Sequence, residues 1–144
     1  MHIKLTNGIP AKYTLGQLRR DNPKTSFPKV IPDALLSSYD VYPYVVQDAT
    51  FDPLTQNCVE GPLAQVNGQW VLPMVAQNKP QAEAESRIRS MRDQFLSDTD
   101  WVVIKAYERN ENLPADWEAY RQALRDITAQ SGFPYSVTWP TPPA

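Results

Sequence analysis

Hydrophobic and polar residues alternate over short distances in residues 1–43, which indicates short elements separated by turns. Ile3 and Leu5 have polar neighbours on both sides, as in a short strand. Thr14 and Gln17 have the spacing of a capping box, in which the two side chains accept each other's backbone N–H groups. A short helix is therefore expected to begin directly after Thr14.

A second short helix is predicted after Pro32, because the fixed φ of proline suits the start of a helix. Leu35, Leu36 and Tyr39 would form its apolar side. Asn22, which precedes a proline, is expected to end the first helix.

Residues 44–76 are rich in β-branched and aromatic residues, which favours strands. Asn67 and Gly68 lie between two apolar arms, and this dipeptide favours the positive φ angles of a type I′ hairpin turn. Trp70 follows that turn and is expected to pack on the sheet. Residues 1–77 are therefore predicted to form an N-terminal α+β domain with a hairpin or antiparallel meander.

The pattern becomes helical in residues 78–144, which are predicted to form a second domain. One apolar stripe consists of Ala84, Ile88, Met91 and Phe95. A second stripe, on a helix that should begin near Pro114, consists of Trp117, Tyr120, Leu124 and Ile127. Neither helix can bury its stripe alone, so the two are expected to pack together with Phe95 and Trp117 mostly buried. Gly132 is expected to end the last helix in the left-handed conformation.

Two further segments of this second domain carry local signals. Residues 97–100 interrupt the first helix, and Asp98 and Asp100 are interpreted as caps of a short helix at Trp101 rather than as an acid–base pair. Residues 136–144 are uncharged and contain Trp139 and three prolines, so an extended tail is predicted. We expect this tail to dock on its own helices, with Trp139 folded back toward Trp117. Docking on a partner is the alternative.

These elements predict an α+β fold. A small N-terminal part has short helices and an antiparallel β-meander or hairpin. A C-terminal helical pair and an extended proline-rich tail follow.

Composition and charge restrict the classes of function that the chain can have. The chain has 144 residues, 14 prolines and a net charge of −2, and neither half is basic, which argues against general nucleic-acid binding. No apolar run approaches the length of a membrane span, and no apolar signal region is expected at the start. The lone Cys58 leaves no partner for an internal disulfide, so a reducing compartment is expected.

Candidate catalytic chemistry is sparse. His2 is the only histidine, which argues against hydrolysis schemes built on a histidine base. Cys58 is interpreted as a small apolar strand residue, with an intermolecular disulfide left open. Arg87, Arg89 and Arg92 alternate with acidic residues, which is typical of a solvated helix face. We expect no catalytic residue, no metal site and no cofactor, and hence no enzyme activity.

Five motifs follow in order along residues 70–144. They are Arg92-Asp93, Asp100-Trp101, Trp117 with Tyr120-Arg121, Arg125-Asp126, and Trp139-Pro140 with Pro143. In this order they resemble the C-terminal domain of phage tail assembly chaperones, a group that overlaps the tail fibre assembly proteins. The more apolar stretch after Trp101 departs from that pattern. Residues 18–28 resemble leaders that precede this domain in some phage proteins.

The resemblance implies a non-enzymatic chaperone that binds a phage tail fibre or another tail protein in the host cytoplasm. Fibrous β-rich trimers form non-local contacts slowly and expose strand edges, so they benefit from such help. The motif residues would bind the partner or organise the core, with Arg121 and Arg125 expected to pair with Asp93 or Asp126. The alternative is a permanent component of the virion tail or baseplate, such as a fibre-bound cap or adaptor. The oligomeric state is left open.

Overall fold

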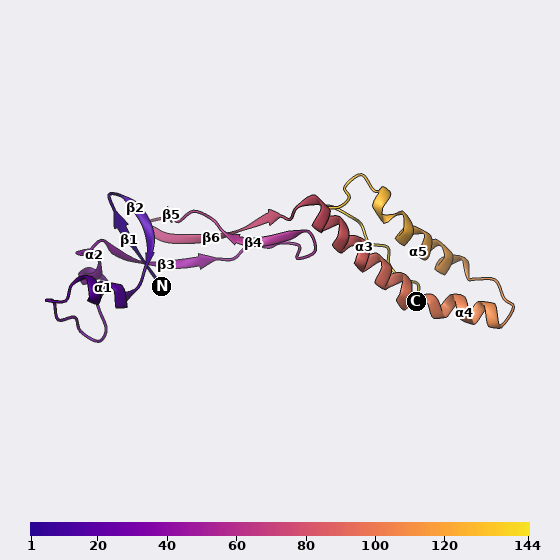
Figure 1. The fold of residues 1–144 in the computed structure, drawn as a ribbon, viewed down its shortest axis with the longest axis horizontal. Helices are drawn as coiled ribbons and strands as arrows, with labels where there is room; N and C mark the ends of the chain where they lie inside the picture. The colour runs from indigo at the N-terminus through magenta and orange to yellow at the C-terminus, as the bar shows by residue number, and fades with distance from the viewer. The chain divides into compact units, whose positions relative to one another are not determined.

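The computed structural model describes the whole chain, Met1–Ala144, and has the α+β composition expected from the sequence. Contacts divide it into two compact units (Figure 1). Unit 1 consists of residues 1–50 and 58–76, and unit 2 consists of residues 51–57 and 77–144. The domain division between residues 77 and 78 stays a prediction.

The strands are β1 (His2–Thr6), β2 (Ile9–Tyr13), β3 (Val41–Gln47), β4 (Gln56–Glu60), β5 (Ala64–Val66) and β6 (Gln69–Asn78). The helices are α1 (Leu15–Asp21), α2 (Asp33–Ser37), α3 (Gln81–Asp98), α4 (Asp100–Glu108), α5 (Ala115–Arg125) and the 3₁₀ helix η1 (Asp126–Ala129).

The strands form a mixed sheet in the order β2-β1-β3-β6-β4, with β5 also paired to β6. β1 is antiparallel to both β2 and β3, but β3 and β6 are parallel, with Tyr44 opposite Trp70. The expected antiparallel meander is therefore not confirmed. A parallel pair needs a long crossover, and residues 48–68 between the two strands provide it.

Two β-hairpins have Asn-Gly dipeptides at their turns. Asn67 and Gly68 have φ angles of 50° and 80° between β5 and β6, which confirms the predicted turn. Asn7 and Gly8 have φ angles of 52° and 79° between β1 and β2. Sequence reasoning missed this second hairpin, although the same dipeptide was available to signal it.

The helices of unit 1 form as expected and close its core. The Thr14–Gln17 capping box is complete, and Asn22 caps the C-terminus of α1. α2 begins after Pro32 and is short. One buried cluster consists of Leu18, Ile31, Leu36 and Val41, and a second consists of Ile3, Tyr44 and Leu72 with Trp70 packed against it.

In unit 2, α3 packs against α5, which confirms the predicted helical pair (Figure 1). The fully buried apolar residues of this pair and of η1 are Ala84, Ile88, Leu124 and Ile127. Phe95 and Trp117 are partly buried, with most of each side chain covered, which agrees with the expectation that both are mostly buried. Each makes an edge-to-face aromatic contact, Phe95 with Trp139 and Trp117 with Tyr120.

The junction between α3 and α4 differs from the sequence interpretation. Asp98 is the last residue of α3, and no side chain caps the N-terminus of α4. The Thr99 hydroxyl instead donates to the Phe95 and Leu96 carbonyls, which closes the end of α3. At its other end α4 stops at Glu108, and Asn110 just beyond it has a φ of 51°. The Asn110 N–H donates to the Tyr107 carbonyl and the Glu111 N–H donates to the Ala106 carbonyl, which are the paired bonds of a Schellman motif.

The segment after α5 also differs from expectation at Gly132. This residue is not left-handed, so its predicted role as a helix stop is wrong. A Cβ here would overlap the Ser136 carbonyl oxygen, so glycine is needed because two backbone segments approach closely. The Ser136 N–H donates to the Gly132 carbonyl at 2.7 Å.

The last residues contact unit 2 itself. The Tyr135 hydroxyl donates to the Lys79 carbonyl, and Gln130 exchanges two hydrogen bonds with the Thr138 backbone. Trp139 is partly buried and packs on Phe95, with ring centroids 5.3 Å apart, and not on Trp117 as expected. The extended form predicted for the proline-rich tail stays a prediction.

Candidate functional site

A buried polar centre of unit 2 is built around Arg121. This α5 side chain is 7% exposed. Its Nη1 donates to the Leu96 carbonyl at 2.7 Å and to the Thr99 hydroxyl at 2.6 Å. Its Nη2 pairs with the Asp100 carboxylate at 2.7 Å. Arg121 therefore joins three elements: α5, the end of α3 and the start of α4.

The charges at this centre agree with the helix dipoles. The guanidinium lies at the C-terminus of α3, where partial negative charge gathers on unpaired carbonyl groups. Asp100 lies in the first turn of α4, where partial positive charge gathers. The planar guanidinium carries its donors on separate nitrogens, so Nη1 serves the carbonyl and the hydroxyl while Nη2 serves the carboxylate. The pair of Arg121 with Asp100 therefore connects two of the five motifs.

The other charged motif residues pair differently from expectation. Arg121 pairs with Asp100, so its predicted pairing with Asp93 or Asp126 is wrong. Arg92 pairs with its neighbour Asp93 at 2.6 Å. Asp126 accepts hydrogen bonds from Gln122, while Arg125 is exposed and forms no ion pair. Sequence spacing could not reveal the Arg121 contacts, because its partners lie more than twenty residues away.

The arginines on α3 lie on a solvated face, as predicted. Arg87 pairs with Glu83 and Arg89 with Glu85, each four residues apart. Hydrogen bonds from Gln81 and then from Arg89 lower the pKa of Glu85. These arginines are neutralised locally and do not form an anion site.

Aromatic residues of the five motifs lie on α4 and α5 and contact one another. Trp117 contacts Trp101 at a centroid distance of 6.3 Å and Tyr120 at 6.0 Å, both edge to face. Tyr120 is buried, but Trp101 is 56% exposed. Trp101 therefore lies at the surface of unit 2 and not in its core. Pro140, beside Trp139, is partly buried.

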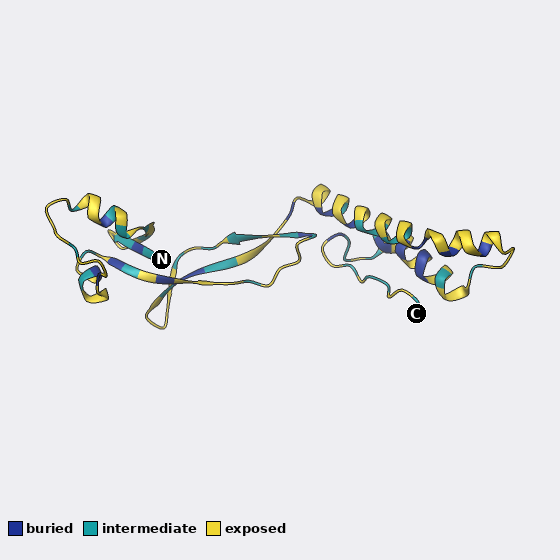
Figure 2. Cartoon of the chain, turned by 90° about the horizontal axis from the view of Figure 1, so that it is seen from below, coloured by how far each residue is buried: buried dark blue, intermediate teal, exposed yellow.

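Sequence reasoning also missed how apolar the outside of α4 is. Ile104 is 56% exposed and Tyr107 is 87% exposed, while Val102 and Ala106 are buried on the opposite side. Figure 2 shows exposed positions along much of this helix. The sequence signal was present, because apolar residues in α4 occupy both faces of the helix.

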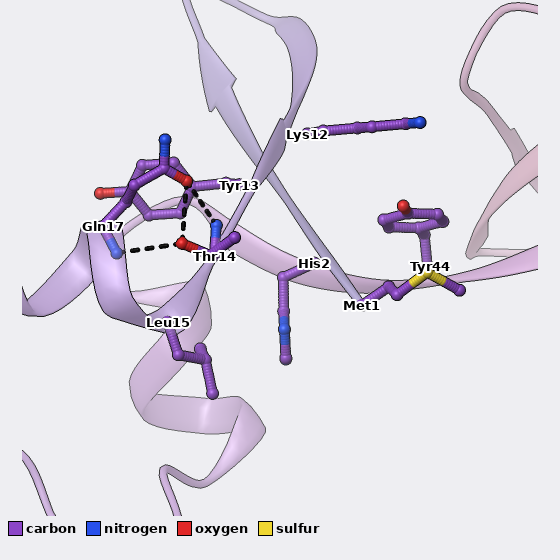
Figure 3. A pocket seen from close by; sticks show the side chains of 8 residues that line it. All are labelled: Met1, His2, Lys12, Tyr13, Thr14, Leu15, Gln17 and Tyr44. Atoms are coloured by element: carbon purple, nitrogen blue, oxygen red, sulfur yellow. Dashed lines mark hydrogen bonds between the residues drawn. The ribbon is translucent and has the colours of Figure 1, made fainter.

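Unit 1 contains a separate cavity of about 480 Å³ beside β2. It is lined by Met1, His2, Lys12, Tyr13, Thr14, Leu15, Gln17 and Tyr44 (Figure 3).

The polar groups around this cavity are mostly engaged with one another. Thr14 and Gln17 bond to each other, the Tyr13 hydroxyl donates to Asp21, and Lys12 pairs with Glu60. These contacts leave His2 as a titratable side chain without such a partner. Burial lowers the pKa of His2, which favours its neutral form. No nucleophile and base pair is assembled here.

Cys58 lies in β4, partly buried and without a disulfide, as a small strand residue should. An intermolecular disulfide at Cys58 stays open, as in the sequence analysis. No group of three or more histidine, cysteine, aspartate or glutamate residues is placed to hold a metal ion. No helix is both long and apolar enough to cross a membrane.

Comparison with known families supports the resemblance found in the sequence. Residues 85–144 match the family described as phage tail assembly chaperone protein. The match begins later than the predicted start at residue 70, and all five motifs lie within it. Comparison with curated proteins and with solved structures finds no match for the chain. The family match supports a role in phage tail assembly, which implies a tail protein as partner and a non-enzymatic role.

Proposed function

We propose that this protein is a non-enzymatic chaperone of phage tail fibre assembly that binds a fibre or another tail protein in the host cytoplasm. The family match over residues 85–144 carries the proposal. The Arg121 centre supports it, because the charged motif residues at this centre pair with each other and with the end of α3, and they leave no reactive group. Binding to a partner would therefore depend on surfaces rather than on catalysis.

Exposed apolar surface on a protein of this size is consistent with that role. Val45 and Val46 are consecutive in β3 and are 43% and 38% exposed, so apolar side chains emerge on both faces of this strand. Contiguous apolar surface in small proteins marks contact sites for partners. A fibre chain exposes unpaired strand edges while it folds, and a bound chaperone would cover them.

Co-expression tests the proposal. The tail fibre protein of the same phage is produced with and without the full chain, and its soluble trimer is measured by gel filtration. We expect the trimer yield to rise with the full chain and a complex to be captured through a tag on it. Equal yields without a captured complex would refute fibre binding.

The proposed chaperone and its permanent-component alternative differ after assembly. A chaperone leaves the completed fibre, whereas a cap or adaptor stays attached to it. Mass spectrometry of purified tail particles distinguishes them, because peptides of an attached protein are recovered in a fixed ratio to fibre peptides.

A further inference from the structure

The α4 helix is apolar on two sides. Val102 and Ala106 are buried, whereas Trp101, Ile104 and Tyr107 are 56%, 56% and 87% exposed. We call these last three residues the outer face of α4. Single exposed apolar residues are ordinary, but three at successive spacings of three on one helix form a patch. A helix that is apolar all round is normally covered on every side.

A cavity lies beside Trp101, the one residue of the outer face that lines it. It has a volume of about 160 Å³ and lies between α4 and the start of α5, with Trp101, Pro114 and Trp117 in its wall. Pockets for small molecules usually measure about 300–1,000 Å³, so this cavity is too small for that class of ligand. It suits one large apolar side chain of a protein partner. Interface hot spots usually fill such pockets.

The rim of the cavity has a cationic side. Lys105 and Arg109 both lie on it, and neither forms an ion pair within the chain. Lys105 lies over the Trp101 ring at 5.8 Å, a contact that leaves its charge uncompensated. Glu111 is the one acidic residue on the rim. A carboxylate beside the inserted side chain would complement Lys105 and Arg109.

The chain itself and a second copy fit this site less well. Trp139, the large aromatic residue of the tail, already packs on Phe95. A two-fold contact centred on the cavity would bring Lys105 and Arg109 of both copies close together. Such like-charge contacts disfavour the wrong partner. Charge complementarity therefore favours a different protein with acidic residues.

We propose that the outer face of α4 and its cavity bind a segment of a tail protein that inserts one large apolar side chain flanked by aspartate or glutamate. This inference rests on the proposed function and names the surface that carries it. Trp101 and Ile104 would contact the apolar part of the segment. Lys105 and Arg109 would pair with its carboxylate.

The test uses the full chain, tagged and co-expressed with the tail fibre protein of the same phage. Ile104→Ser removes apolar surface from α4, and Ile9→Ser is the matched control because Ile9 is 69% exposed in unit 1. We expect Ile104→Ser to weaken capture by about tenfold or more, the loss typical of a hot spot, and Ile9→Ser to leave it unchanged. Circular dichroism should show that both variants fold. Equal capture by Ile104→Ser and wild type, or loss in Ile9→Ser alone, overturns the inference.

The charge requirement has its own test. Arg109→Glu should weaken capture, most strongly at low salt, whereas Arg125→Glu on the exposed side of α5 should not. Overlapping peptides from the captured protein should bind the full chain only where a large apolar residue adjoins aspartate or glutamate. Binding of basic peptides, or an unchanged Arg109→Glu complex, contradicts the proposed chemistry.

The outcomes separate the inference from the proposed function. Capture by wild type and equally by Ile104→Ser leaves the chaperone role intact and rejects this surface. If wild type captures neither the fibre nor another tail protein of the phage, the proposed function fails and the inference fails with it. A wild-type dimer that Ile104→Ser dissociates without affecting fibre capture would assign the face to a second copy.

Discussion

Replacing Arg121 with methionine tests whether the α3–α4 junction depends on a buried cation. Methionine keeps an apolar stem of similar length but removes the guanidinium. The two hydrogen bonds from Nη1, to the Leu96 carbonyl and the Thr99 hydroxyl, are lost. The pair with Asp100 is lost as well.

The loss in the free energy of unfolding depends on which hydrogen bonds each former partner of Arg121 still makes. Hydrogen bonds to charged groups contribute about 1.5–3 kcal/mol each. The lower end applies here, because the Leu96 carbonyl still accepts the Thr99 N–H and hydroxyl after the substitution. The Asp100 side chain is 57% exposed, so water replaces its partner and the ion pair adds less than about 1 kcal/mol. The free energy of unfolding should fall by about 3–4 kcal/mol on these values.

Urea unfolding followed by circular dichroism at 222 nm measures this change, because the long helices lie in unit 2. Arg125→Met is the control, since Arg125 lies one turn later on α5, is exposed and forms no ion pair. It should change the free energy of unfolding by less than about 0.5 kcal/mol. Equal stability of Arg121→Met and wild type, or an equal loss in both variants, would refute the reasoning.

Three other predictions concern the core, a turn and a hydroxyl group. Leu124→Ala should lower the free energy of unfolding by about 2–5 kcal/mol because Leu124 is fully buried, whereas Ile104→Ala should cost under about 0.5 kcal/mol in urea unfolding. Gly68→Ala should destabilise by roughly 1 kcal/mol because φ is +80°, and Gly16→Ala in α1 should stabilise by about 0.4–1 kcal/mol, both in thermal melts. A Gly68→Ala variant as stable as wild type or more stable would contradict the assigned turn. Burial, then a hydrogen bond to a carboxylate, raises the pKa of Tyr13 to about 12, so its contribution to stability is complete below pH 10 and is lost as pH rises through about 12. The absorbance difference at 295 nm between wild type and Tyr13→Phe measures this pKa, and a value near 10 would contradict the structure.

Much of the local structure could be predicted from the sequence. The capping box of α1, the Asn67-Gly68 turn and the Leu124 stripe depend on residues within about one or two helical turns of one another. Local chemistry and periodicity determine such features directly. The five C-terminal motifs could also be recognised in the sequence, and the family match covers all of them.

What the sequence could not determine depends on partners distant along the chain. The parallel pairing of β3 with β6 joins residues separated by a long crossover. Arg121 has ordinary helix neighbours, and only the folded chain brings Leu96, Thr99 and Asp100 within its reach. Gly132 looked like a helix stop, but the nearby return of the Ser136 backbone is what requires it.

The sequence alone therefore determined the elements, because their capping, turn and periodicity signals are local. Tertiary structure decided which charged residues form pairs and which aromatic residues remain exposed to solvent. The pattern that predicts α4 as apolar cannot tell its two faces apart, because both are apolar. Packing against the neighbouring helices of unit 2 buries Val102 and leaves Trp101 and Ile104 exposed.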